Sequence, residues 1–333
     1  MKAARLLPLA MLVGGVLAAP GPVGAEGTLQ LTPWKTSPEL PSSIPANPAP
    51  SSSPAAAAAP GADLAFGAFQ RGYYVTALQE AMKRIDANPG DGPAMTLIGE
   101  LYKDGLGVNR DAVEAAHWFR LAADRGDRQA TFALGLAYLE GTGVAKDRAM
   151  AQSLFEKAAA QGHAGALYNL GVMAIDDGDF ARAADYFRRS AKAGDTDAAV
   201  SLAEFFQQGT GVGKDLKKAA DLLRQAADER NIAAEVEYGI ALFNGQGVDK
   251  DEAAAAKYFL RAAAQNNPVA ENRIARMLAA GAGIRKDMIE AMKWHILARA
   301  AGIKDDWLDA QLDTLSAQDR LAVEIAVRKY VGN

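Results

Sequence analysis

Residues 209–215 read GTGVGKD, a glycine-rich phrase with a lysine and a carboxylate placed just before a predicted helix. Glycine-rich loops can present backbone N–H groups and a lysine to phosphate. A Walker-type loop also needs a glycine at the position of Gln208 and a hydroxyl residue at the position of Asp215. A carboxylate at that second position repels phosphate. The sequence therefore argues against a nucleotide site, and the glycines need another explanation.

Histidine and cysteine, the usual residues of metal sites and nucleophilic catalysis, offer no site either. His117, His163 and His295 are the only histidines, and they fall in different registers, so no metal-ligand spacing exists. The chain has no cysteine, which excludes thiolate ligands, cysteine nucleophiles, disulfides and a lipid-anchored cysteine. We therefore predict a protein that is not an enzyme, with no catalytic residues, no cofactor and no metal, whose histidines have ordinary surface roles.

The glycine phrase is one of a series of copies. The others are GLGVNRD at 105–111, GTGVAKD at 141–147, GQGVDKD at 245–251 and GAGIRKD at 281–287. The first glycines are 36, 68, 36 and 36 residues apart. The longer gap holds one further copy, in which residues 166–187 keep the flanking helical pattern but replace the phrase with a tighter DDGDF turn. Self-similarity at such a period predicts a solenoid.

Each phrase has the composition of a turn between two helices. We predict that the first glycine ends one helix in the left-handed conformation and that the final aspartate caps the next by accepting its free N–H groups. Glu114 and Glu290, three residues after their aspartates, further predict capping boxes. The predicted hinge glycines and capping aspartates are Gly105, Gly141, Gly209, Gly245 and Gly281, with Asp111, Asp147, Asp215, Asp251 and Asp287.

Two columns of residues keep the same register around the turn. A small residue precedes the turn, which predicts a close helix crossing, because a glycine inside a helix otherwise costs stability. An aromatic residue or leucine follows the turn, and we predict that it lies in the core. The small column is Gly99, Gly135, Gly171, Ala203, Gly239 and Ala275, and the aromatic column is Trp118, Leu154, Tyr186, Leu222, Tyr258 and Trp294.

The two ends of the chain differ from the copies. Residues 1–25 have two cations, an apolar run and small residues before the end, which predicts a secretory signal peptide cleaved after Ala25, with an uncleaved anchor as the alternative. The Pro-, Ala- and Ser-rich residues 26–62 predict a disordered linker. Residues 63–93 predict an atypical opening hairpin, and 304–333 predict capping helices. The formal net charge of −4, without a polybasic run, argues against nucleic acid as a partner.

The pattern A-x-x-x-L-G-x-x-Y-x-x-G-x-G-V-x-K-D, followed by A-x-x-W/L/Y-x-x-x-A-A, resembles the Sel1-like repeat family, relatives of tetratricopeptide repeats. The resemblance covers residues 94–303 as six copies. It implies an all-α, right-handed α/α superhelical solenoid that assembles or regulates other proteins. Exported members of the family include periplasmic regulators that restrain a membrane sensor kinase. The resemblance therefore implies a periplasmic scaffold that binds an envelope protein or peptide, with no transmembrane helix in the mature chain.

In tetratricopeptide-like hairpins the first helix of each copy lines the concave face. The small column then places the outward positions three residues before it, one after it and four after it. These positions are apolar in copies two, three and five, which predicts a groove for a partner helix or peptide. The predicted groove residues are Phe132, Leu136, Leu139, Tyr168, Val172, Ile175, Val236, Ile240 and Phe243. The alternative is that the superhelix buries them against itself.

Two other functions stay open beside the scaffold. One is a cell-wall-related enzyme or a binder of β-lactams or muropeptides, because a cysteine-rich branch of the family is associated with β-lactams. This chain has neither those cysteines nor a Ser-x-x-Lys motif. The other is an architectural oligomer.

Overall fold

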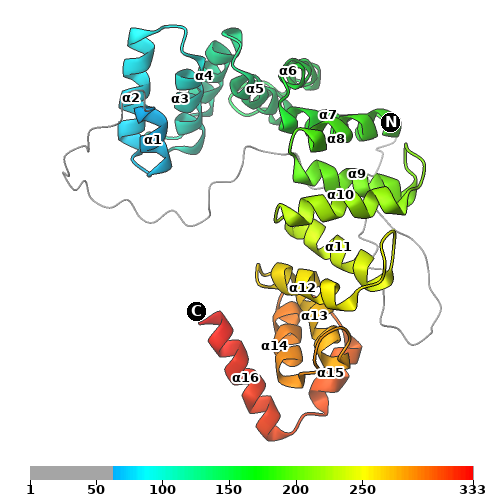
Figure 1. Ribbon diagram of the computed structural model, residues 1–333. Coiled ribbons are helices and arrows are strands. Elements are labelled where there is room, and N and C mark those ends of the chain that lie inside the picture. The colour runs from blue at the N-terminus through cyan, green and yellow to red at the C-terminus, as the bar shows by residue number, and fades with distance from the viewer. Residues whose placement is uncertain (1–62, 333) are drawn as a thin grey trace, which may run out of the picture. The chain divides into compact units, whose positions relative to one another are not determined.

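The computed structural model describes residues 63–332, and every regular element in that range is an α-helix (Figure 1). The predicted signal peptide and the predicted linker lie outside the described residues. Within residues 63–332, no helix is long and apolar enough to cross a bilayer.

The chain divides into two units, and the boundary between them lies between Gly178 and Asp179. The helices of the first unit are α1 (Leu64–Gln70), α2 (Tyr74–Ala87), α3 (Gly92–Asp104), α4 (Ala112–Asp124), α5 (Arg128–Glu140), α6 (Arg148–Ala160) and α7 (Ala164–Asp176). Those of the second are α8 (Phe180–Lys192), α9 (Thr196–Gln208), α10 (Leu216–Asp228), α11 (Ile232–Asn244), α12 (Glu252–Ala263), α13 (Pro268–Ala280), α14 (Met288–Ala300), α15 (Asp306–Asp313) and α16 (Ala317–Val331). From α1 to α7 and from α8 to α15 each helix packs on the next one in the chain, and α16 packs on α14.

The glycine phrases form the turns inside the hairpins. In the second copy, Gly141 ends α5 with φ 80° and donates its N–H to Ala137 O at 2.8 Å. Asp147 begins α6, where its side chain accepts from Met150 N at 2.9 Å. The other phrases have the same geometry, so all five hinge glycines are left-handed C-caps and all five aspartates are side-chain N-caps.

The prediction of capping boxes is wrong. The backbone N–H of Asp111 donates to Tyr102 O at 2.9 Å, and that of Asp287 donates to Leu278 O at 3.0 Å. The donor that a capping-box glutamate would use is therefore already bound within the turn. Glu114 accepts from Trp118 Nε1 at 2.9 Å instead, and Glu290 pairs with Lys293.

The second glycine of each phrase stacks one hairpin on the preceding one. Gly143 has φ 74°, and a Cβ atom there would lie 1.9 Å from Ala112 O, at the start of the second helix of the preceding copy. Gly247 has φ 72°, and its Cβ would lie 2.0 Å from Leu216 O. No side chain fits against a carbonyl at these distances, so the second glycine is required by contact between copies. The local turn requires only the first glycine.

The small column lies against a ring from the second helix of the same hairpin. A Cβ at Gly99, Gly135 or Gly239 would lie 2.5, 2.7 or 2.9 Å from the nearest ring carbon of Phe119, Phe155 or Phe259, respectively. The ring comes from the residue after the predicted aromatic column. The column itself is less uniform than predicted, because Trp294 is buried whereas Trp118 and Tyr258 are half-buried.

The two columns vary together along the chain. Glycine pairs with phenylalanine by register at Gly99 and Phe119, Gly135 and Phe155, Gly171 and Phe187, and Gly239 and Phe259. In copy four the pair is Ala203 and Leu223, and in copy six it is Ala275 and His295. These two alanines are fully buried, so a methyl group is tolerated only where the opposing side chain is not phenylalanine.

The last hairpin is closed by polar contacts as well as apolar ones. Asp305 caps α15 and binds Arg276 of α13 through both carboxylate oxygens, at 2.6 and 2.8 Å. His295 is fully buried, with Nε2 2.8 Å from Asp309 Oδ1, so the predicted surface role of this histidine is wrong. Tyr330 of α16 packs edge-on against Trp294, with ring centroids 5.1 Å apart.

The contact between glycine and phenylalanine predicts how stability changes when residues of one copy are replaced by those of another. Gly135→Ala should lower the free energy of unfolding by roughly 1–3 kcal/mol, because the new methyl group overlaps the Phe155 ring. This loss is expected even though alanine favours a helix over glycine by up to about 1 kcal/mol. Gly135→Ala with Phe155→Leu recreates the pair of copy four and should lose less than the sum of the single changes. Urea unfolding followed by circular dichroism measures all three.

Gly67→Ala in α1 is the matched control, since its Cβ would meet only the end of the Arg71 side chain at 3.4 Å. That change should leave stability unchanged or raise it. A Gly135→Ala protein that is as stable as the parent would show that the ring does not require the glycine.

Candidate functional site

The glycine-rich phrase at residues 209–215 does not have the geometry of a free phosphate-binding site. Asp215 caps α10 by accepting from Lys218 N at 3.0 Å, and its other oxygen lies 3.0 Å from Lys218 Nζ. Gly209 and Thr210 both donate their N–H groups to Phe205 O. The helix terminus that a phosphate would need is thus bound by the chain's own carboxylate.

The remaining histidines also have structural explanations. His163 begins α7, where its Nδ1 accepts from Ala166 N at 3.1 Å and its Nε2 lies 2.9 Å from Gln129 Oε1. His117 is exposed on α4, beside Trp118. In the part of the chain that the structure describes, no cluster of three or more His, Asp or Glu residues could hold a metal ion.

The first helices of the hairpins form one face in each unit, and we call each of these a first-helix face. The face of the first unit comprises α3, α5 and α7, and that of the second unit comprises α9, α11 and α13. Within the units α3 contacts α5, and α9 contacts α11. The predicted groove residues lie on these helices, so each unit has its own set of them.

In the first unit most predicted groove residues are buried. Phe132, Leu136, Leu139, Tyr168 and Val172 have less than a tenth of their surface exposed. Phe132 shows why, since its ring stacks on His163 with centroids 4.2 Å apart and approaches Phe155 at 5.8 Å. These side chains fill the space between successive helices. Ile175 is the exception and is half-buried.

The second unit repeats this division. Val236 and Ile240 are buried, whereas Phe243 is half-buried and has Lys250 Nζ 5.6 Å from its ring centroid. Ile175 and Phe243 both lie four residues after the small column. At that register Ile175 and Phe243 stay partly accessible, whereas Leu139 is buried.

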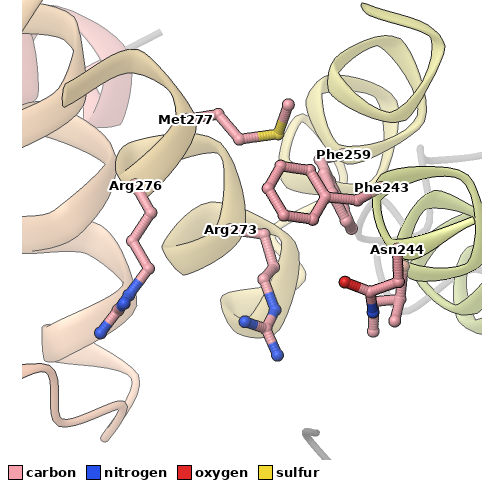
Figure 2. A pocket seen from close by; sticks show the side chains of 7 residues that line it. Phe243, Asn244, Phe259, Arg273, Arg276 and Met277 are labelled. Carbon is pink, nitrogen blue, oxygen red and sulfur yellow. The ribbon is translucent and has the colours of Figure 1, made fainter. Parts of the chain in front are cut away.

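Phe243 borders a shallow pocket between α11 and α13. Ile240, Phe259 and Met277 form its apolar part, and Asn244, Arg273 and Arg276 its polar part. Figure 2 shows Arg273 below the two phenylalanine rings and Arg276 directed away from them. The free volume is about 10 Å³, roughly the space of one water molecule. The pocket is too small to enclose a substrate.

Ionisable groups that sequence reasoning missed line the same face of the second unit. Burial raises the pKa of Glu204 on α9 to about 7, and the negative charge of Glu237 on α11 adds to the rise. Burial also raises the pKa of Glu237, against the opposing effect of Arg273. Burial and the charge of Arg276 lower the pKa of Arg273. The sequence shows that these positions are polar, but it does not show that their side chains are buried. For this reason the sequence did not identify Glu204, Glu237 and Arg273 as a group.

These features define an α/α solenoid repeat protein. A Sel1 repeat model matches residues 92–127, 128–163, 164–195, 196–231, 232–267 and 268–303. These matches cover more than half of the chain, which therefore belongs to the Sel1 repeat family. Sel1 repeat proteins are generally scaffolds for protein interactions.

Solved structures of two proteins are similar to this chain. A Sel1 repeat protein from Oxalobacter formigenes is 32% identical with a TM-score of 0.65, over 71% of this chain and 98% of that one. The antigen c5321, present in uropathogenic Escherichia coli strains, displays an SLR fold and is 25% identical with a TM-score of 0.49, over 78% of this chain and 64% of that one. No curated protein matched the chain.

The raised pKa of Glu204 predicts a pH dependence of stability. The folded state favours the protonated carboxyl, so this group's stabilising contribution is complete below the unfolded pKa and is lost as the pH rises through about 7. Glu204→Gln, which stays neutral, should therefore be more stable than the parent at pH 8 by roughly 1–2 kcal/mol and should differ little at pH 4. Urea unfolding across this pH range measures the difference.

Glu140→Gln is the control, because Glu140 is exposed at the end of α5. It should leave the pH profile unchanged. Parallel profiles for the parent and Glu204→Gln would show that Glu204 ionises freely in the folded chain.

Proposed function

We propose that this protein is an exported, non-catalytic scaffold that binds an envelope protein through its first-helix faces. The observation that carries the proposal is the accessibility of Ile175 and Phe243, which packing within their own units leaves half-exposed. Exposed apolar side chains at a repeated register are typical of helix or peptide docking. The polar positions nearby, including Glu204 and Arg276, give that surface a charge pattern that selects among partners.

Export is part of the proposal and rests on residues 1–25. If the segment is a signal peptide, the N-terminal residue of the protein recovered from the periplasm should be Glu26. Mass spectrometry of the intact protein measures this directly. A chain that keeps Met1 and stays in the cytoplasm would contradict both the export and the envelope partner.

Photo-crosslinking in intact cells tests the binding face. A photoreactive residue at position 175 or 243 should give a discrete product with one protein, whereas position 217, exposed on α10, should give none. Ile175→Ser with Phe243→Ser should abolish capture of that protein and leave helicity unchanged. Leu139→Asp is unsuitable for this purpose, because Leu139 is 6% exposed and a buried carboxylate would unfold the hairpin.

The alternatives give other outcomes. Equal labelling at positions 175 and 217 would contradict recognition through the first-helix faces. A crosslinked dimer of the chain itself would favour the architectural oligomer. A correctly exported protein that gives no product at any position, but binds a muropeptide or β-lactam, would favour the cell-wall ligand binder.

A further inference from the structure

The second unit contains a cavity away from the accessible positions of its first-helix face. It lies between α8 and α10, where α9 begins, and its volume is about 260 Å³. Ala199, Leu202 and Leu222 are among the residues that form its apolar wall, and Lys192, Gln225 and Glu229 contribute polar groups. This volume exceeds that of the pocket in Figure 2 many times over, and it is large enough for an aromatic side chain.

The cavity exists because copy four has small side chains where copy five has large ones. The residues 36 positions further on occupy the equivalent places in the next hairpin. Each of four wall residues is the smaller of its pair, namely Ala199 against Glu235, Leu202 against Tyr238, Leu222 against Tyr258, and Gln225 against Arg261.

Copy five shows what this space holds when it is filled. Tyr238 and Tyr258 pack edge to face with centroids 5.1 Å apart. The guanidinium of Arg261 covers the Tyr258 ring at 4.8 Å, and its Nε donates to Glu235 Oε1 at 2.8 Å. The Tyr258 hydroxyl donates to Asp228 at 3.3 Å. The repeat geometry thus accommodates a tyrosine ring at this place, with its hydroxyl at the end of the preceding second helix.

We propose that the cavity of copy four binds a tyrosine side chain presented by a partner protein. The ring replaces the missing Tyr258 equivalent against Leu202 and Leu222, where burial of apolar surface stabilises it. Its hydroxyl lies toward Lys192, which occupies the register of Asp228 and donates to the phenol oxygen. This site shares no residue with the predicted groove, so it is a second recognition point that goes beyond the proposed function.

Nuclear magnetic resonance with N-acetyl-L-tyrosinamide as the probe tests the site. The purified chain, labelled at leucine methyl groups, should show saturable shifts of the Leu202 methyls with this probe and at least tenfold weaker binding of N-acetyl-L-leucinamide. Leu222→Trp, which introduces the residue of copies one and six, should weaken tyrosinamide binding at least tenfold by filling the cavity. Leu202→Tyr, which introduces the residue of copy five, is the second variant that fills the cavity. It should also weaken tyrosinamide binding, which calorimetry measures.

Leu154→Trp is the matched control, since Leu154 occupies the same register as Leu222 in the first unit. It should bind the probe as the parent does. Melting temperatures equal to or above that of the parent would show that the filled variants are folded. Absence of saturable shifts, or unchanged affinity in both folded filling variants, would overturn the proposal.

Discussion

The repeat array depends on the contact between the backbone of a first helix and an aromatic ring from the second helix of the same hairpin. At Gly135 the ring of Phe155 occupies the place of a side chain, which brings the two helices closer than any Cβ would allow. A phenylalanine that covers a glycine buries a large apolar area in one step. The helices themselves are rich in alanine, and Phe155 is one of the largest fully buried side chains of the chain's described part.

A second close approach converts hairpins into an array. Gly143 lies against Ala112 O of the preceding copy, and Gly247 lies against Leu216 O in the same way. The glycine-rich phrase thus serves two contacts, one that ends a helix and one that stacks a neighbour. Both contacts use the absence of a side chain, and the first also binds the N–H groups of Gly141 and Thr142 to Ala137 O. The glycines of this phrase, which resemble those of a nucleotide site, are therefore required by the helix end and by the packing of one hairpin on the next.

Departures from the repeat are where the chain gains distinctive surfaces. Ile175 and Phe243 place partly accessible apolar side chains at a register where copies one and four have Lys103 and Gln207. Copy four lacks the tyrosines and the ion pair that fill copy five, and a cavity is the result. Glu271 has the register of Glu235 but Leu297 stands at the place of Arg261, so burial raises the pKa of this carboxyl to about 7. In a chain of similar repeats, such substitutions make one copy differ from another, because the residues that all copies share are used for packing.

The sequence by itself determined the helices, their turns and their repetition, because these follow from local rules. A left-handed glycine such as Gly141 and a capping aspartate such as Asp147 act within a few residues, and their recurrence fixes the period. Only the tertiary structure decided which outward positions stay accessible and where space is left unfilled. Leu139 and Ile175 share a register, but one is buried and the other half-exposed. The cavity depends on the joint size of side chains from three helices, α8, α9 and α10. Such volumes are set by neighbours in space, and no single repeat contains them.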